Sequence, residues 1–210
     1  MYNTSNLMSP RQYRLGRRQA ASEETRKRVL AAARALLASE GVLDFTIDRV
    51  AQRAGVARMT IYYQFESKRG LLDALIETLS PGALAGRLGA RLGRAEPFEA
   101  LGELIGAFAG FWSSNRVVTR RLCGLAALDP EVGDSLRSRD DDRRAGLRAL
   151  VARVAEQHGR PSAQAMDDAV DVLRVLTSFE TFDALAGVSR SPEEVATILI
   201  RSAHAVLGLG

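Results

Sequence analysis

The polar residues between Ala57 and Phe65 are of the types that contact nucleic acid. On a helix, Ala57, Ile61 and Phe65 would share one side, because they recur at intervals of four residues. The other positions would lie outward or on the flanks: Arg58, Met59, Thr60, Tyr62, Tyr63 and Gln64. Arginine, threonine and glutamine can read base edges, methionine can contact a thymine methyl group, and tyrosine hydroxyls can reach phosphates. The segment predicts a helix that enters a DNA groove; the alternative is a surface helix with two tyrosines packed against a neighbour.

A phosphate contact is predicted immediately after this segment. Ser67 can cap a helix, and Lys68 would then lie in its first turn. At such a position a side-chain cation is combined with free backbone N–H groups and the positive end of the helix dipole, and all three attract an anion. Lys68 is therefore expected to hold a phosphate of the DNA backbone.

Several short helices must position these residues. The first is expected to begin at Ser22, and the second follows Thr46, a possible N-cap, and ends at Gly55. Gly55 can adopt the positive φ that a tight turn requires, and Ala51 is small enough for two helices to approach closely. A further apolar helix is expected between Ser67 and Pro81. This arrangement predicts a helix-turn-helix.

The net charge of +4 is distributed unevenly along the chain. Residues 1–70 contain 13 Lys and Arg against 6 Asp and Glu, whereas residues 71–210 contain 16 against 19. A basic first third favours contact with a polyanion, although a charged surface that only confers solubility is the alternative. Residues 1–21 are polar, rich in arginine and without apolar periodicity, which predicts a flexible basic arm.

The remainder of the chain has helical periodicity and no sustained β-type alternation, which predicts an all-α fold. The expected helices are Pro97–Ser113, Arg116–Leu128, Glu131–Gln157, Ser162–Ala186 and Pro192–Leu207. The charges of residues 137–148 are interleaved at helical spacing, which predicts a solvated helix face with ion pairs and no further function. We divide the chain into the arm (1–21), a three-helix helix-turn-helix domain (22–68) and a larger helical domain (69–210).

The segment from Thr25 to Leu79, and particularly TIDRVAQRAGVARMTIYYQFESKRGLLDAL, resembles the DNA-binding domain of TetR-type transcriptional regulators. The shared features are Val50-Ala51, Ala54-Gly55-Val56, Thr60-Ile61-Tyr62, Phe65, Ser67-Lys68 and Leu71-Leu72. The resemblance covers about a quarter of the chain. It implies that Arg58, Met59, Thr60 and Tyr63 face bases, that Tyr62, Gln64, Lys68 and Thr46 hold the DNA backbone, and that Arg17 and Arg18 belong to an arm that enters a minor groove.

Two residues depart from the family pattern. Ala57 replaces the serine or threonine that often caps the recognition helix, and this loss costs about 1 kcal/mol of capping. Asp48 lies where some relatives have a base-reading arginine. An acidic residue there would repel phosphate or accept a hydrogen bond from a cytosine amino group.

The resemblance also implies a C-terminal domain that dimerises and binds a ligand. Two apolar stripes on the last helices are the expected dimer interface, although such stripes could equally form the core of the monomer. The expected interface residues are Leu173, Leu176, Val195, Ile198, Leu199, Ser202 and Val206. Aromatic and polar residues of the middle helices are the expected lining of a ligand pocket, with packing in the core as the alternative. These residues are Phe108, Phe111, Trp112, Arg120, Cys123 and Phe179.

The sequence argues against other classes of protein. Cys123 is the only cysteine, so a disulfide within the chain and a thiolate metal cluster are not expected, and the protein should be cytoplasmic. No stretch is apolar over the roughly 20 residues that span a bilayer. His158 and His204 lack the neighbours of a catalytic triad or a metal site, so neither an enzyme nor a bound cofactor is expected.

We therefore expect a ligand-responsive repressor that binds a palindromic operator as a homodimer and is released by a lipophilic or aromatic small molecule. The alternative is a DNA-binding regulator or activator of the same fold without an effector.

Overall fold

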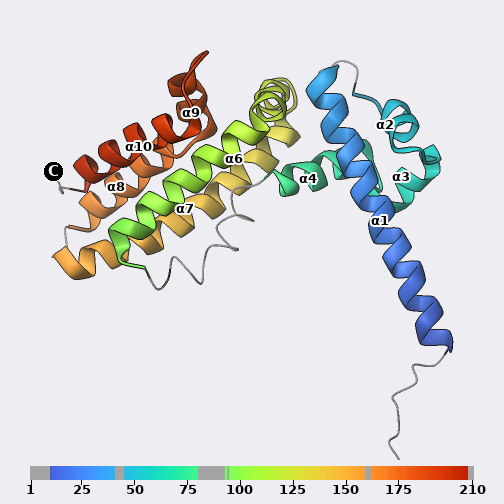
Figure 1. Ribbon diagram of the computed structural model, residues 1–210, viewed down its shortest axis with the longest axis horizontal. Coiled ribbons are helices and arrows are strands. Elements are labelled where there is room, and N and C mark those ends of the chain that lie inside the picture. The colour runs from blue at the N-terminus through green and yellow to red at the C-terminus, as the bar shows by residue number, and fades with distance from the viewer. Residues whose placement is uncertain (1–9, 41–44, 80–92, 94, 159–161, 208–210) are drawn as a thin grey trace, which may run out of the picture. The chain divides into compact units, whose positions relative to one another are not determined.

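The computed structural model describes residues 10–40, 45–79, 93, 95–158 and 162–207, and these residues form helices joined by turns (Figure 1). The chain divides after Leu75 into two compact units. The first unit contains α1 (Pro10–Ser39), α2 (Ile47–Ala54), α3 (Arg58–Phe65) and most of α4 (Lys68–Thr78). The second contains α6 (Pro97–Ala126), α7 (Pro130–His158), α8 (Ala163–Leu176), α9 (Phe179–Ala186) and α10 (Pro192–Val206). The prediction of an all-α fold is confirmed for the described residues.

Helices α2 and α3 form the predicted helix-turn-helix. The Thr46 hydroxyl accepts a hydrogen bond from the Arg49 N–H and so caps α2. Gly55 ends α2 with φ at 64°, a conformation that favours glycine. Both helices pack on α1 through fully or almost fully buried side chains, which include Val29, Ala33, Leu37, Val50, Ile61 and Phe65. The apolar contacts fix the direction in which the outer face of α3 points.

The joint between α3 and α4 is unusually tight. Glu66 has φ at 66° and ψ at −41°, and the Ser67 N–H donates to the Phe65 carbonyl over 2.7 Å, which together describe a γ-turn. A Cβ atom on Gly70 would lie 2.0 Å from the same Phe65 carbonyl oxygen, so only glycine fits there. The Ser67 hydroxyl accepts from the Gly70 N–H and caps α4, as the sequence predicts.

The second unit is built around α6, which packs along α7 and α10, while α8 packs against α7 and α10 (Figure 1). Its core is formed by apolar residues of α6, α7, α8, α9 and α10. The largest fully buried side chains in it are Leu101, Ile105, Leu147, Leu173 and Phe182.

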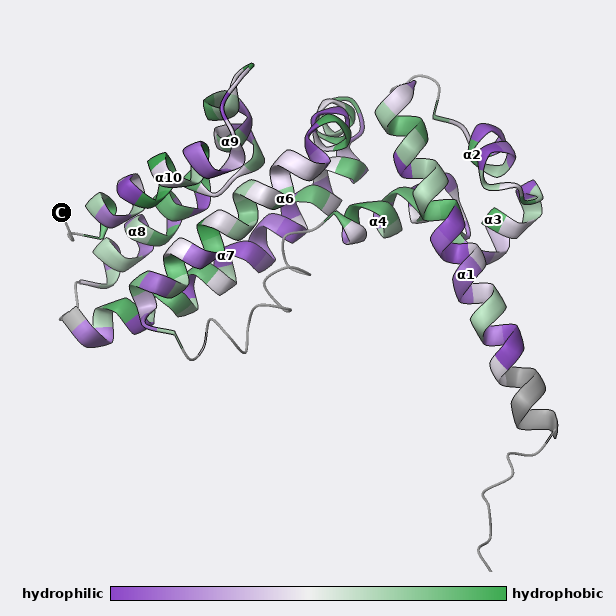
Figure 2. Ribbon diagram, in the orientation of Figure 1, coloured by the Kyte–Doolittle hydropathy of each residue, from purple (hydrophilic) through white to green (hydrophobic). Residues whose placement is uncertain are grey.

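The N-terminal arm differs from its prediction. Residues 10–21 are helical and continue into α1, so Ser22 lies inside a helix and does not cap one. The turns of α1 around residues 16–24 are exposed and largely hydrophilic (Figure 2). Apolar periodicity marks only helices that bury one face. It did not reveal this helix, because residues 16–24 are all exposed. The boundary between the units also lies at Leu75 and not at residue 68.

Two helix boundaries in the second unit also differ. The predicted break near Ser113 is absent, because Ser114 and Asn115 donate side-chain hydrogen bonds to the Gly110 and Phe111 carbonyls and remain within α6. The predicted helix Ser162–Ala186 is instead divided, since Ser178 accepts from the Thr181 N–H and starts α9 as its N-cap. Within the described ranges, no helix is long and apolar enough to cross a membrane.

Candidate nucleic-acid interface and interior cavity

The outer face of α3 carries large side chains that are open to solvent. Met59 and Tyr63 are 72% and 88% exposed, whereas Ile61 and Phe65 on the opposite side are buried. Arg58 is exposed, and Thr60 and Tyr62 are half-buried on the flanks. The helix therefore presents the base-reading set predicted from the sequence on its accessible side. Contact of these residues with DNA stays a prediction.

Arg58 is held at the start of α3 by two neighbours. Its Nη1 lies 3.1 and 3.0 Å from the two carboxylate oxygens of Asp48 on α2, and its Nη2 donates to the Tyr62 hydroxyl over 3.1 Å. The guanidinium also lies over the Tyr62 ring, 5.5 Å from its centre. The hydrogen bond to Tyr62, with the charge of Asp48, raises the pKa of Arg58. Ala57 provides no side-chain cap for this helix, as expected from the residue type.

The residues predicted to bind phosphate differ in exposure: Lys68 and Thr46 are exposed, whereas Gln64 is half-buried. Lys68 lies at the start of α4, with its ammonium 5.6 Å from the centre of the Phe45 ring and its side chain exposed. Thr46 is exposed at the start of α2. The Gln64 amide instead donates to the Ser22 carbonyl of α1 over 3.1 Å, and Arg26 donates to the Gln64 carbonyl. Gln64 thus joins α3 to α1, a role that the periodicity of α3 alone did not reveal.

Arg17 and Arg18 are exposed side chains of α1. The expectation that they belong to a flexible arm is wrong, because an α-helix includes both. An extended arm can follow the floor of a minor groove, whereas a helix is too wide for it. The two arginines consequently add positive charge to a rigid element.

A half-open cavity of about 400 Å³ lies within the second unit. Its apolar wall includes Leu79, Trp112, Leu122, Leu136 and Phe179, and Ile76 contributes from the end of α4. Polar side chains also line it, among them Thr119, Asp140, Arg143, Arg174 and Glu180. The size and the mixed lining are those of a small-molecule site.

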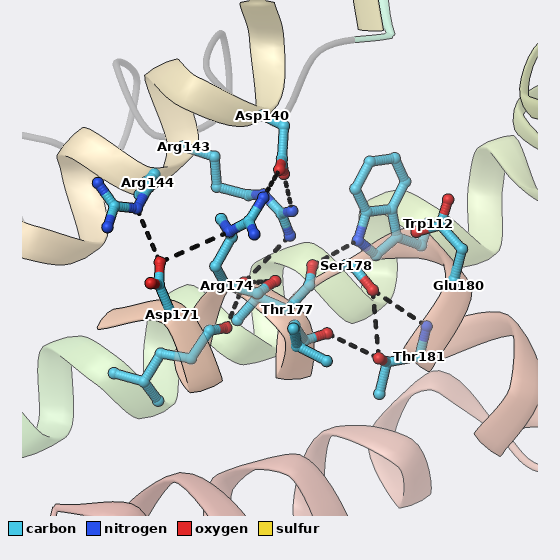
Figure 3. A network of polar contacts seen from close by, with 12 residues as sticks. Trp112, Asp140, Arg143, Arg144, Asp171, Arg174, Thr177, Ser178, Glu180 and Thr181 are labelled. Atoms are coloured by element: carbon cyan, nitrogen blue, oxygen red, sulfur yellow. Dashed lines mark hydrogen bonds and ion pairs between the residues drawn. The ribbon is translucent and has the colours of Figure 1, made fainter. Parts of the chain in front are cut away.

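One wall of the cavity is a chain of charged and hydrogen-bonded groups (Figure 3). Arg143 is 8% exposed and donates to Asp140 and to the Thr177 hydroxyl, and Arg174 donates to the second oxygen of Asp140 over 2.5 Å. Partial burial would raise the pKa of Asp140, but the hydrogen bonds and charges of Arg143 and Arg174 hold it below its ordinary value. The Trp112 indole N–H extends the chain by donating to the Thr177 carbonyl over 3.1 Å.

The six residues predicted for ligand binding fall into two groups. Trp112, Cys123 and Phe179 line the cavity, and the Trp112 and Phe179 rings meet edge to face at 5.6 Å. Phe108, Phe111 and Arg120 lie outside the lining. Phe108 is buried in the core, Phe111 packs against that core, and Arg120 pairs with Asp183 over 2.6 Å. Helical periodicity shows which face of a helix is apolar. It does not show which residues of that face line a cavity and which pack in the core.

The Cys123 thiol is a neutral group of the cavity wall. It donates a weak hydrogen bond to Glu180 over 3.7 Å, and burial, with the adjacent Glu180 charge, raises its pKa to about 12. The thiol is therefore protonated at neutral pH, and a nucleophilic thiolate is not available.

Asp140 and Arg143 were missed by the sequence reasoning. The prediction that residues 137–148 form only a solvated face is wrong in part, since Arg143 is buried and Arg137, Arg139, Asp140 and Arg143 line the cavity. Thr177 and Arg174, the partners of Arg143 and Asp140, lie more than 30 residues further along the chain. No local pattern contains that information.

The predicted dimer residues are likewise divided. Leu173, Val195 and Leu199 are buried in the core of the monomer, where α10 packs on α6 and α8 packs on α7 and α10. Leu176, Ile198 and Ser202 are half-buried, and Val206 is exposed. On α8 the exposed apolar side chains are instead Val172 and Val175.

The two histidines give no catalytic arrangement within the described side chains. His204 packs edge to face on Phe98, with ring centres 5.9 Å apart. The side chain of His158 is outside the described residues. No three His, Cys, Asp or Glu residues of the described part gather as metal ligands.

The N-terminal part of the chain is similar in sequence to known regulatory proteins. Residues 29–75 match the family described as bacterial regulatory proteins, tetR family. The HTH-type transcriptional regulator SrpR of Pseudomonas putida is 40% identical over 57 residues, which are 27% of each chain. The uncharacterised HTH-type transcriptional regulator TtgW, also of Pseudomonas putida, is 39% identical over 57 residues, 27% of this chain and 42% of TtgW. The matches thus span less than half of these relatives.

Solved structures resemble the chain over most of its length. A TetR-family transcriptional regulator from Rhodococcus sp. aligns with a TM-score of 0.74 at 18% identity, over 88% of this chain and 99% of that one. NalD, the secondary repressor of the MexAB-OprM multidrug efflux pump in Pseudomonas aeruginosa, aligns with a TM-score of 0.64 at 20% identity, over 89% and 96%. At these identities the alignments establish the fold. Both relatives found by sequence are named as HTH-type transcriptional regulators. Residues 29–75 thus match the tetR family of bacterial regulatory proteins, and the described helices share the fold of the solved TetR-family regulators.

Proposed function

We propose that the protein is a repressor that binds a palindromic operator as a homodimer and leaves it when a small molecule enters the cavity of its second unit. The exposed face of α3, with Arg58, Met59 and Tyr63 outward on a helix held by Ile61 and Phe65, is the observation that carries this proposal. Selection of bound fragments from a random DNA pool tests it. Enrichment of one inverted repeat is the expected result, and recovery of unrelated sequences would contradict it.

Dimerisation is proposed from the geometry of DNA. One short recognition helix makes few base contacts, whereas two that are related by a twofold axis reach successive major grooves about 34–36 Å apart, or a multiple of that. The accessible apolar side chains of α8 and α10 that lie outside the cavity lining, Val172 and Val206, are the proposed contact between protomers.

Ligand response is proposed from the cavity. Its walls include Ile76 and Leu79, which belong to the end of α4 and the turn after it, while α4 begins at Lys68, directly after the helix-turn-helix. A ligand that favours one position of these residues would act on the helix that leads directly to α3. To change the bound fraction from 99:1 to 1:99, the ligand must prefer the released state by about 5.5 kcal/mol.

The first expected result concerns Lys68. Lys68→Ala removes one phosphate contact and should weaken binding to every DNA sequence alike, with the slope of log affinity against log salt flatter by about one unit. Fluorescence titration at several salt concentrations measures that slope. Arg190→Gln, at the turn before α10, removes one charge outside the interface and should leave the slope unchanged. Equal slopes for wild type and Lys68→Ala would refute the phosphate contact.

The second expected result concerns the cavity. A thermal-shift screen with lipophilic and aromatic compounds should give compounds that raise the melting temperature of the wild type and release it from the selected operator. Cys123→Phe adds volume to the cavity wall and should weaken such a compound at least about tenfold, because a filled site cannot accept it without displacing packed atoms. Cys123→Ser, which keeps the volume, is the matched control. Stabilisation by no compound would favour a regulator without an effector.

A further inference from the structure

We propose that Asp48 is a specificity-determining residue, which sets the base preference of the protein by fixing how Arg58 is presented to DNA. This inference rests on the proposed function, because it concerns how the DNA-binding face reads sequence. Asp48 is on α2 and Arg58 is the first residue of α3, so their ion pair crosses the turn of the motif. In the structure Asp48 pairs with Arg58. This differs from the direct base contact that the sequence suggested for an acidic residue at this position.

The hydrogen bonds of Arg58 leave a defined part of its guanidinium free. A guanidinium has five N–H donors. Asp48 takes two contacts from Nη1 and Tyr62 takes one from Nη2, so the Nε–H and a second Nη2–H carry none of these bonds. When Tyr62 takes the Nη2–H that is remote from Nε, the two free donors lie side by side and match the O6 and N7 acceptors of guanine, the commonest partner of arginine in the major groove. The contacts therefore favour recognition of a guanine by Arg58.

The ion pair is too exposed to serve mainly as a stabilising element. The side chains of Arg58 and Asp48 are 56% and 66% exposed, and pairs of this kind contribute little to folding. Their value lies in orientation, because an arginine side chain on a surface otherwise samples many rotamers. With Asp48 on one side and the Tyr62 ring on the other, Arg58 meets DNA already ordered.

Asp48 also makes a distinctive prediction about nonspecific binding. Its negative charge lies beside the DNA-facing helix and repels phosphates of any sequence. Its removal should therefore have two opposite effects: weaker discrimination for the cognate guanine and stronger binding to unrelated DNA. A residue needed only for folding would lower both affinities together.

The experiment compares Asp48→Ala, Arg58→Ala and the double variant on the selected operator and on operators with single base-pair changes. Asp48→Ala should reduce discrimination about fivefold at the base pair where Arg58→Ala reduces it. Binding to unrelated DNA should strengthen by about two- to threefold at low salt. In the double variant, loss of Asp48 should add little to the loss of Arg58, since one acts through the other. Additive effects, or loss of discrimination at a different base pair, would overturn the proposal and favour direct reading by Asp48.

A measurement without DNA separates this inference from the proposed function. The side-chain Nε of Arg58 in the free protein should be rigid in nitrogen-15 relaxation of the wild type and mobile in Asp48→Ala, while Asp48→Asn, which keeps an acceptor oxygen, should be intermediate. Equal mobility in wild type and Asp48→Ala overturns the inference whatever the protein binds. A rigid Arg58 in a protein that selects no DNA sequence would instead overturn the proposed function.

Discussion

Replacing Arg58 with alanine should weaken binding to the selected operator by about 5- to 150-fold, which corresponds to about 1–3 kcal/mol for a bidentate contact with a base pair. Two causes act in the same direction. The two free donors of the guanidinium are lost, and the carboxylate of Asp48, now without its partner, faces the phosphates. Titration of the variant on the operator and on unrelated DNA measures the difference. The repulsion acts on every sequence, so both affinities should fall, with the larger loss on the operator, where the base contact is also lost.

Arg58→Lys provides the matched control. It keeps the positive charge but lacks the planar pair of donors, so the salt dependence of binding should resemble that of the wild type while the base preference is lost. If Arg58→Lys kept full discrimination, a point charge would be sufficient, and the bidentate contact would have to be rejected.

Replacing Leu173 with alanine should lower the free energy of unfolding by about 2–5 kcal/mol, as expected for a large apolar side chain removed from a close-packed core. Leu173 is 1% exposed and lies among the α6 and α10 residues of the second unit. Denaturant unfolding at two protein concentrations measures the loss. The change should be present at both, because it arises within one protomer.

Val172→Asp tests the adjacent position on the same helix. This side chain is 42% exposed and lies outside the cavity lining, so an aspartate there keeps its hydration in the monomer. We expect the protomer to remain folded and the fraction of dimer in light scattering to fall relative to the wild type. If instead Leu173→Ala dissociated the dimer without loss of stability, the core position assigned to Leu173 would be wrong.

The outer face of α3 was predictable because its determinants are local. Ile61 and Phe65 lie one turn apart, and burial of both fixes the orientation of every residue between them. Thr46 and Gly55 are likewise specified by short-range chemistry, a side-chain cap and a positive φ. In such segments the local sequence and the tertiary packing favour the same backbone conformation.

The cavity and the dimer residues were less predictable because their determinants are not local. Leu173 and Val172 are consecutive apolar residues, and only the packing of α8 on its neighbours decides which of them is buried. Arg143 became part of a cavity wall through its hydrogen bond to Thr177, a contact that depends on how α7 meets the end of α8. The helix over residues 10–21 was missed for the opposite reason: backbone propensity forms it, and no apolar stripe marks it.

The γ-turn at Glu66 and the contact of Gly70 with the Phe65 carbonyl have a mechanical consequence. A joint this short, with backbone packed against backbone, leaves little room for α3 and α4 to turn independently. A rotation of the first turn of α4 would therefore change the direction of α3. Under the proposed ligand response, control would act on the angle of α3 and leave the helix itself intact.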